Sequence, residues 1–150
     1  MFLKELLWSR EINRLLQVRR RYTDYLSRKA VRQWVQENFR RIGKAIGVEC
    51  GDMVLSQQTH TTNVRLVTEK DRGKGIARER DYTDVDGLIT DVPGICLVTS
   101  FADCVPLYFV DPVKKAIGLS HSGWRGTVGR IGQKTIEKMQ QCFGSDPSDI

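Results

Sequence analysis

Three observations predict an α/β fold with a β-rich middle. The first 44 residues contain no proline, their first glycine is Gly43, and their apolar side chains recur at helical spacing. From residue 53 to residue 120 the pattern changes to short runs of β-prone residues between polar or turn-forming ones. Helical spacing returns from Thr127 onward. A chain of 150 residues with 40% apolar side chains can bury one sizeable core, which predicts a single domain.

The N-terminal region predicts two helices. We expect residues 1–30 to form a helical, basic segment, and residues 31–46 to form a second helix that packs on the core. The apolar positions that carry these predictions are Leu3, Leu6, Leu7, Trp8, Ile12, Leu15 and Leu16 in the first helix, and Val31, Val35, Phe39, Ile42 and Ile46 in the second.

Positive charge is concentrated at the start of the chain. The first 44 residues carry 12 Lys and Arg against four Asp and Glu, whereas the whole chain has a net charge of +6. An arginine run such as residues 19–21 would suit the phosphates of nucleic acid or an anionic membrane surface. Runs of charge on a helix more commonly face water. The sequence therefore favours a solvated helix face over a nucleic-acid or membrane partner.

The middle of the chain predicts six strands, at residues 53–56, 63–68, 87–90, 95–101, 107–110 and 116–120. The last two are expected to form a hairpin, because Asp111 favours the start of a turn and Pro112 presets φ. Residues 69–84 are rich in charge and glycine and have no period. They read as a solvent-facing loop that partly covers a site.

The C-terminal helix is predicted to begin with Thr127 as its N-cap and to end at Gly144. Its inward positions are expected to be Val128, Ile131, Thr135, Met139 and either Cys142 or Phe143.

Composition excludes several classes of protein. The longest apolar runs fall far short of the roughly 20 residues that a membrane-spanning helix needs. The first residues lack the basic patch, apolar run and small-residue site of a secretory signal. Four cysteines, Cys50, Cys96, Cys104 and Cys142, form no CxxC pair, which favours free thiols in a reducing compartment over disulfides. We therefore expect a cytoplasmic protein.

The only two histidines, His60 and His121, lie in polar motifs on either side of a third motif that contains Cys104. Three ligands of this kind leave one coordination position open, which is the pattern of a catalytic zinc site. Separations of 44 and 17 residues mean that only the folded chain can assemble them. Alternatives remain open at this point, because a lone histidine can be a hydrogen-bonded turn residue and the thiol can be a nucleophile or packing.

The motif Gly118-Leu-Ser-His-Ser-Gly-Trp-Arg-Gly-Thr127 reads as a strand, a turn and a helix start. Backbone N–H groups at a helix start favour an anion, and Arg125 adds a planar charge that can grip phosphate. Gly126 would allow a close approach to another backbone or to a ligand.

Four motifs in this order resemble the multicopper polyphenol oxidase, or laccase-domain, family, whose members are now described as zinc-dependent purine nucleoside phosphorylases that also deaminate adenosine. The resemblance runs from about Val31 to Ile150. The motifs are Gln58-Thr-His60, Asp84-Val-Asp-Gly-Leu-Ile-Thr90, Ala102-Asp-Cys-Val-Pro-Leu107 and Ser120-His-Ser-Gly-Trp-Arg-Gly126.

The resemblance implies a single α/β domain with a mixed, largely antiparallel sheet flanked by helices. It implies that His60, Cys104 and His121 bind Zn²⁺, with copper as the alternative metal. The implied substrates are purine nucleosides (adenosine, inosine, guanosine and methylthioadenosine) with inorganic phosphate, which yield the base and ribose 1-phosphate, and adenosine for deamination. The implied catalytic residues are Asp103, Cys104 and Arg125, and the implied substrate contacts are Gln58, Trp124, Arg125 and Gly126.

Two of these positions have competing interpretations. Asp103 adjoins a ligand and reads equally as a general acid or base or as a residue that orients the ligand. Trp124 reads equally as a platform for a purine or as a packing lid. Asp86 is predicted to be structural, because an Asp-Gly pair suits a turn.

The chain also departs from the family. Residues 1–30 are unlike it, and family members continue beyond the equivalent of Ile150, so we expect a domain incomplete at both ends. Two other functions stay open: a copper-dependent polyphenol oxidoreductase, although one Cys and two His lack the larger histidine set of a multicopper cluster, and a non-enzymatic basic binding module or inactive fragment.

Overall fold

The computed structural model describes residues 28–150, and the chain divides into two compact units, Met1–Cys50 and Gly51–Ile150. The predicted helix over residues 1–30 lies almost wholly outside the described residues. The boundary predicted after residue 30 stays a prediction. No helix in the described part of the chain is long and apolar enough to span a membrane.

The described part of the first unit is dominated by helix α2, Arg28–Ile46. It matches the helix predicted at residues 31–46, and Gly47 ends it in the left-handed region with φ 76°. The Val48 N–H donates to the carbonyl of Gly43 at 2.8 Å, which is the hydrogen bond of a Schellman C-cap. Glu37 accepts hydrogen bonds from Arg40 and Arg41 on the surface of the helix.

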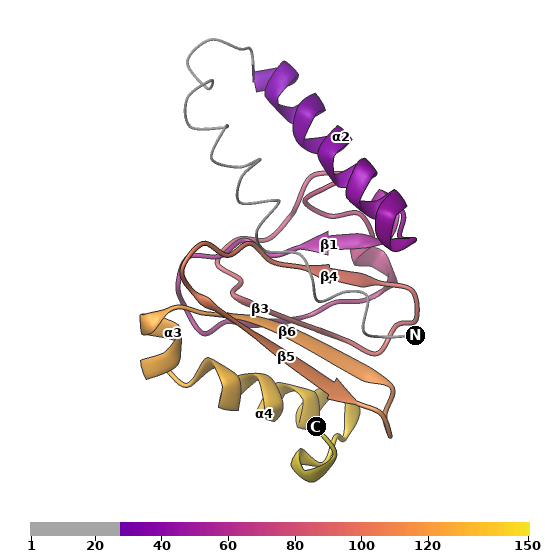
Figure 1. Ribbon diagram of the computed structural model, residues 1–150. Helices are drawn as coiled ribbons and strands as arrows, with labels where there is room; N and C mark the ends of the chain where they lie inside the picture. The colour runs from indigo at the N-terminus through magenta and orange to yellow at the C-terminus, as the bar shows by residue number, and fades with distance from the viewer. Residues whose placement is uncertain (1–27) are drawn as a thin grey trace. The chain divides into compact units, whose positions relative to one another are not determined.

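The second unit contains six strands in two sheets (Figure 1). Strands β1 (Met53–Leu55) and β4 (Cys96–Val98) pair in parallel. A four-stranded sheet has the order β2-β3-β6-β5, from β2 (Val64–Leu66), β3 (Gly87–Thr90), β6 (Ala116–Ser122) and β5 (Val105–Asp111). Its β2–β3 pair is parallel, and β6 runs antiparallel to both β3 and β5. The predicted fold class, a mixed and largely antiparallel α/β arrangement, is confirmed.

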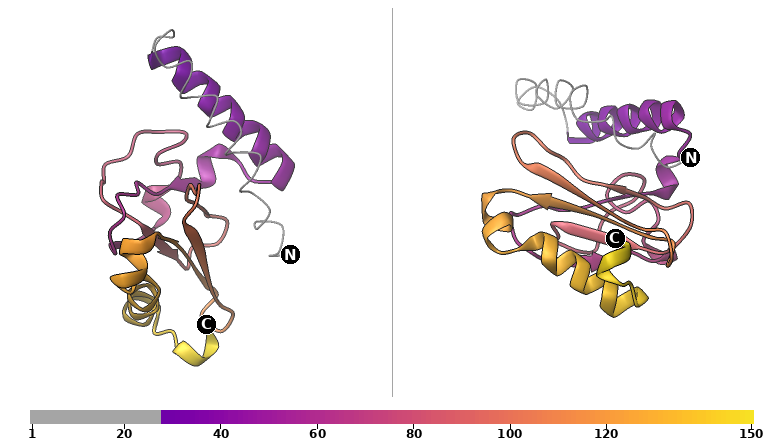
Figure 2. Two further views of the ribbon diagram at one scale, coloured as in Figure 1. Left: turned by 60° about the vertical axis from the view of Figure 1, so that its left-hand side comes forward. Right: turned by 60° about the horizontal axis from the view of Figure 1, so that its bottom comes forward.

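Two apolar clusters lie on opposite faces of β3, because Leu88 and Ile89 are consecutive strand residues and point to opposite sides. Leu88 packs with Val54, Val67, Val85 and Ile95 on the face toward β1 and β4. Ile89 belongs to the cluster of Phe109, Ala116 and Met139, which packs helix α4 (Ile131–Phe143) on the other face. Figures 1 and 2 show α4 along this face of the sheet.

The hairpin between β5 and β6 forms where it was predicted. Asp111 pairs with Ala116, and the Asp111 carboxylate accepts the N–H groups of Val113 and Lys114 at 2.9 and 2.8 Å. Pro106, in the motif that contains Cys104, lies within β5. The sheet tolerates it there because β5 is an edge strand, where a missing N–H need not break a ladder.

The predicted C-terminal helix is two helices, so the predicted start at Thr127 is wrong. Helix α3 (Trp124–Val128) has Gly123 as its N-cap, and α4 follows after Arg130, whose φ is 61°. Thr127 does not cap a helix, because its hydroxyl donates to the Gly123 carbonyl at 2.9 Å within α3. The predicted inward position Val128 is also wrong, with 76% of its surface exposed. Ile131, Thr135 and Met139 are buried as expected, and Gly144 ends α4 in the left-handed region.

The segment from 69 to 84 is not simply a solvent-facing loop. Asp71 and Lys74 are only 3% and 8% exposed, and the Lys74 ammonium donates to the Asp71 carboxylate at 2.7 Å. Arg65 donates to the same carboxylate at 2.9 Å, and Asp81 accepts from Lys74 at 2.8 Å. The charges that suggested solvent exposure form a partly buried ion network.

Candidate metal centre

The sheet register brings three distant segments to one end of β6. His121 lies on β6 and is paired across the strand gap with Pro106, so Cys104, just before β5, lies at the same end. On the other side of β6, the His121 N–H donates to the Asp86 carbonyl at 2.7 Å. Asp86 immediately precedes β3. Because β6 is the strand between β3 and β5, residues from both neighbours reach His121.

His60 reaches the same place from the loop between β1 and β2. The loop is fixed at both ends: the Gln57 carbonyl accepts from Val85 N–H at 2.9 Å, and the Asn63 carbonyl accepts from Asp86 and Gly87 N–H at 3.0 Å. His60 itself has φ 66°, in the left-handed region that residues other than glycine rarely adopt. Such a conformation persists only where the surrounding structure holds it.

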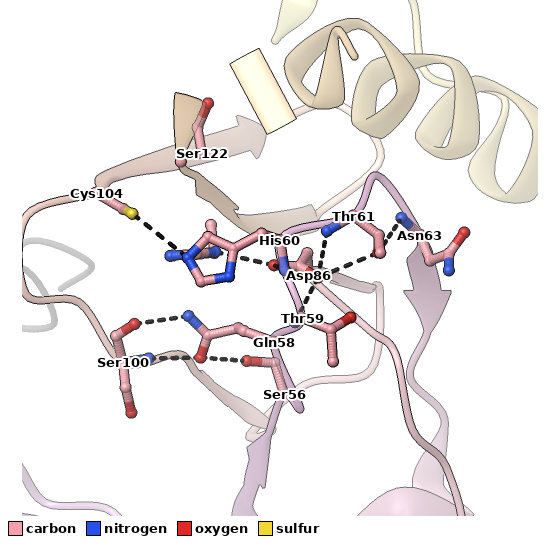
Figure 3. Close-up of polar contacts among 12 residues, drawn as sticks. Ser56, Gln58, Thr59, His60, Thr61, Asn63, Asp86, Ser100, Cys104 and Ser122 are labelled. Atoms are coloured by element: carbon pink, nitrogen blue, oxygen red, sulfur yellow. Dashed lines mark hydrogen bonds and ion pairs between the residues drawn. The ribbon is translucent and has the colours of Figure 1, made fainter. Parts of the chain in front are cut away.

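His60, Cys104 and His121 form one cluster, with their potential ligand atoms all within 4.8 Å of one another. The Cys104 Sγ lies 4.0 Å from His60 Nε2 (Figure 3). At the usual Zn–N and Zn–S bond lengths, ligand atoms of a tetrahedral site are roughly 3.3–3.6 Å apart, so only small movements separate this cluster from a bound geometry. The chemistry and spacing of the donors fit a zinc site with three protein ligands.

The three residues of the cluster differ in exposure. His121 is 4% exposed, Cys104 is half-buried and His60 is exposed. The Phe101 ring lies 5.6 Å from the His121 ring, and the two histidine rings meet edge to face with centroids 5.0 Å apart. A fourth ligand would therefore approach from the His60 side.

Gly123 lies directly against the cluster. A Cβ added at this position would be 3.0 Å from the Cys104 Sγ and 3.0 Å from His60 Cδ2. Real Cβ atoms are rarely so close to their neighbours. A glycine is therefore needed here for space, because its φ of −78° is one that any residue adopts.

Asp86 connects the two histidines. It is fully buried, and its Oδ1 accepts from His121 Nδ1 at 2.9 Å and from His60 N–H at 3.1 Å. Its Oδ2 accepts from the N–H groups of Thr59 and Thr61 at 3.0 Å and from the Thr61 hydroxyl at 3.1 Å. Burial raises the pKa of Asp86, but these hydrogen bonds outweigh it and hold the pKa below its ordinary value. The group is a carboxylate at neutral pH.

The prediction that Asp86 belongs to a turn is wrong. The next residue, Gly87, begins β3, and Asp86 is structural in a different sense, because it joins the loop that carries His60 to the strand that carries His121. Sequence reasoning missed this role. The available signal was an acidic residue directly before a strand in a motif of its own, with no element that required a turn.

Gln58, a predicted substrate contact, is engaged with the protein. Its amide donates to the Ser100 carbonyl at 2.6 Å and accepts from Ser100 N–H at 3.0 Å and from the Ser56 hydroxyl at 3.1 Å (Figure 3). It ties the start of the His60 loop to the end of β4. A substrate role for Gln58 remains a prediction.

The other predicted site residues lie around the cluster with different degrees of exposure. Asp103 is exposed next to Cys104. Trp124 is 72% exposed, and the Arg125 guanidinium lies 5.3 Å from its ring centroid. Gly126 is buried, and an added Cβ would meet the carbonyl oxygens of His121 and Thr61 at 3.4 and 3.5 Å. Gly126 thus has a packing role, because it lets α3 approach the segments that carry His60 and His121.

A separate groove of about 630 Å³ lies along β2, between the loop at residues 82–85 and Lys138 of α4. None of the three clustered residues lines it. The cluster, and not this groove, brings potential metal ligands together.

The structure combines an α/β fold with a buried carboxylate behind a cluster of two histidines and one cysteine that could hold a metal ion. The chain belongs to the family described as multi-copper polyphenol oxidoreductase laccase, whose sequence profile matches residues 26–150.

Curated relatives carry two enzyme names. Purine nucleoside phosphorylase YlmD of Bacillus subtilis is 42% identical over 118 residues, which are 77% of this chain and 42% of that protein. Adenosine deaminase RL5, from an unknown prokaryotic organism, is 40% identical over 95 residues, 63% of this chain and 36% of the relative. Human purine nucleoside phosphorylase LACC1 is 31% identical over 77% of this chain and 25% of its own length.

Solved structures share the fold. Hypothetical protein YfiH of Bacillus licheniformis matches with a TM-score of 0.73 and 37% identity, over 79% of this chain and 45% of that one. YlmD of Geobacillus stearothermophilus matches with a TM-score of 0.71 and 39% identity, over 79% and 44%. The chain spans less than half the length of these relatives.

Proposed function

We propose that this chain carries the zinc centre of a purine nucleoside phosphorylase that also deaminates adenosine. The observation that carries the proposal is the cluster of His60, Cys104 and His121, whose potential ligand atoms lie within 4.8 Å of one another. Relatives named for the two activities share 42% and 40% identity with the chain over 118 and 95 residues. The proposed substrates are adenosine, inosine, guanosine or methylthioadenosine with inorganic phosphate.

The residues of the cluster would hold the ion and leave one side free. His121 is fixed from behind by Asp86, while Cys104 and His60 face it across the gap. Gly123 contributes no side chain that would fill the space beside them. When bound, zinc supplies a Lewis acid for a substrate oxygen or for water.

The neighbouring exposed residues supply the proposed substrate contacts. Arg125 is two residues after Gly123 and presents a permanent planar charge suited to phosphate. Trp124 offers an exposed aromatic face for a purine. Asp103 is exposed next to Cys104, and its proposed role is to give a proton to the leaving base in phosphorolysis or to accept a proton from water in deamination.

Copper-dependent phenol oxidation is the second candidate, favoured by the donor set itself, because one Cys and two His also suit copper. The count of histidines argues against a multicopper centre in this chain. It has two histidines in all, and both are already in the cluster.

The test is metal content and turnover on the purified 150-residue chain. We expect about one zinc per chain by elemental analysis, phosphate-dependent release of hypoxanthine from inosine, and conversion of adenosine to inosine. Cys104→Ala should lose the zinc. The matched control is Cys142→Ala, because Cys142 is also a half-buried free thiol but lies on α4, where it packs against the apolar cluster of Ile89 and Met139.

The outcomes separate the parts of the proposal. Protein without zinc, or Cys104→Ala with full zinc, would contradict the ligand set. Stoichiometric zinc with no hypoxanthine released would contradict the activity. Copper occupancy with oxidation of a phenol and no phosphorolysis would favour the second candidate.

We also propose a cytoplasmic location, where the four cysteine thiols stay reduced.

A further inference from the structure

Asp86 makes more polar contacts than any single structural task would require. Both carboxylate oxygens are used, and the donors come from two segments that are separated by about 60 residues of sequence: the loop that carries His60 and the strand that carries His121. The carboxylate itself is fully buried.

We propose that Asp86 is the positioning residue that prepares the metal centre before an ion arrives, by fixing the tautomer of His121 and the conformation of the His60 loop at once. The inference rests on the proposed function in taking His60 and His121 as ligands. Its structural content, the state of the two histidines without metal, does not depend on any activity.

The tautomer follows from the hydrogen bonds. Oδ1 of Asp86 already accepts the His60 N–H, and Oδ2 accepts two further backbone N–H groups, so the carboxylate acts toward all of them as an acceptor. His121 Nδ1, 2.9 Å from Oδ1, must then carry the ring proton and donate it. The lone pair is left on Nε2, the other ring nitrogen. Neutral histidine with this nitrogen bare is the form that binds a metal.

The same carboxylate holds His60 in place. The N–H groups of Thr59, His60 and Thr61 all point to Asp86, which is possible because His60 adopts its left-handed conformation. An exposed histidine on a loop would otherwise sample several positions. Three hydrogen bonds to one buried anion keep it within reach of the Cys104 thiol.

Asp86→Asn removes the negative charge and one of the two acceptor oxygens of the side chain but leaves its size almost unchanged. If the amide oxygen faces His121, the NH₂ group faces the N–H groups of Thr59 and Thr61, where donors would oppose donors. If the amide is turned round, the NH₂ faces His121 Nδ1 and drives its proton to Nε2. In the first case the His60 loop is released, and in the second His121 loses its free ligand atom.

Asp84→Asn is the matched control. Asp84 lies two residues earlier and also ties the His60 loop, because its carboxylate accepts from the Thr59 hydroxyl and from the Asn63 amide. In the described part of the chain its carboxylate bonds to Thr59 and Asn63 and to neither histidine, and asparagine suits its left-handed φ of 58°. A general loosening of this loop would affect both variants, whereas a positioning role through His121 would affect only Asp86→Asn.

The first experiment is a long-range ¹H–¹⁵N NMR correlation on the metal-free full chain. The chain has two histidines, so the spectrum contains two imidazole patterns and His121 is assigned by His60→Gln. We expect His121 as the Nδ1–H tautomer in the unsubstituted chain and in Asp84→Asn. Observation of the Nε2–H tautomer in the unsubstituted chain would overturn the proposal without any variant that has to fold.

The second experiment is zinc affinity by chelator competition. Loss of a partner that orients a metal-binding histidine typically weakens binding 10–100-fold. We expect a loss in this range for Asp86→Asn and less than threefold for Asp84→Asn. Equal losses in both variants, or an unchanged affinity in Asp86→Asn, would contradict a positioning role. A chain that shows the expected tautomer but binds no zinc would contradict the proposed function and leave the role of Asp86 in the histidine pair intact.

Discussion

Gly123→Ala tests whether the cluster of His60, Cys104 and His121 is a metal site that needs free space beside it. The added methyl group would lie 3.0 Å from the Cys104 Sγ and 3.0 Å from His60 Cδ2, and 3.8 Å from His121 Cε1. The backbone at Gly123 has φ −78° and ψ 177°, which alanine adopts freely. Any effect of the substitution is therefore steric, not conformational.

The size of the effect follows from the overlap. Non-bonded carbon atoms pack best at about 3.5–4.0 Å, so the methyl group would be at least about 0.5 Å too close to each of two ligand residues. Overpacking of this kind typically costs about 1–3 kcal/mol. The cheapest relief is for Cys104 and His60 to move apart, whereas metal binding needs them to come closer together. We therefore expect most of the cost to appear as a zinc affinity lowered by about 5- to 150-fold, at 1.4 kcal/mol for each factor of ten.

The assay is zinc competition with a chromophoric chelator, alongside urea unfolding of the metal-free chain. The matched control is Gly51→Ala, because a Cβ at Gly51 would meet nothing within 4 Å. We expect Gly51→Ala to keep the zinc affinity of the unsubstituted chain. If Gly123→Ala binds zinc within threefold of that value, the reasoning from the geometry of the cluster is wrong.

Three further predictions concern stability, each measured by urea unfolding. Asp71→Asn should lower the free energy of unfolding by about 3 kcal/mol. Removal of one partner of a buried ion pair costs about 3–5 kcal/mol, and the low end applies because Lys74 keeps its ion pair with Asp81. A loss below about 1 kcal/mol would show that the network is solvated. Burial raises the pKa of Asp71, but hydrogen bonds from Lys74, Thr68 and Arg65 outweigh burial and hold the pKa well below its ordinary value of 3.8. The ionised carboxylate therefore contributes its full stabilisation above pH 3.8, and this stabilisation is lost as the pH falls below 3.8. The deficit of Asp71→Asn should accordingly shrink from pH 7 to pH 3, and a constant deficit would contradict the ion pair as its cause. Met139→Ala should cost about 3 kcal/mol, because this fully buried side chain joins α4 to the sheet; a cost below 1 would contradict that packing.

Local patterns in the sequence were sufficient for most elements of the second unit. Alternating or continuous β-prone runs predicted all six strands to within a few residues, and Asp111 with Pro112 predicted the hairpin. These signals are local, because a strand and a two-strand turn depend on side chains within a few positions. The convergence of His60, Cys104 and His121 depends on sheet order, and it was expected from the resemblance to a family and not from spacing.

The break between α3 and α4 shows where local patterns fail. Helical spacing runs without interruption from Val128 to Met139, and nothing in it requires a change of direction at Arg130. The break comes from contacts with a loop that is distant in sequence. A Cβ at Gly129 would be 2.7 Å from Thr62 Cγ2, so the chain turns where it meets the His60 loop. The sequence shows Gly129, but the contact of Gly129 with Thr62 depends on the fold.

The prediction of a solvent-facing loop at residues 69–84, which was based on their charge, was incomplete for a related reason. Asp71 and Lys74, three residues apart, satisfy each other in the structure, and Arg65 on β2 completes the network from outside the segment. Composition gives the number of charged residues in a segment, but it does not show which of them form ion pairs in the folded chain. A charged segment is solvated only when its charges lack such partners, and that depends on the fold.

The same limit explains why the role of Asp86 could not be read from the Asp-Gly pair. In a turn, the glycine after an aspartate supplies a left-handed backbone. Here Gly87 is a strand residue, and its lack of a side chain matters because a Cβ would be 2.7 Å from the Ser120 hydroxyl and 2.9 Å from Val64. That close approach of β2 and β6 to the start of β3 brings Asp86 between the His60 loop and His121. The glycine thus contributes to the geometry of the cluster, because the space it leaves lets one carboxylate reach both histidines.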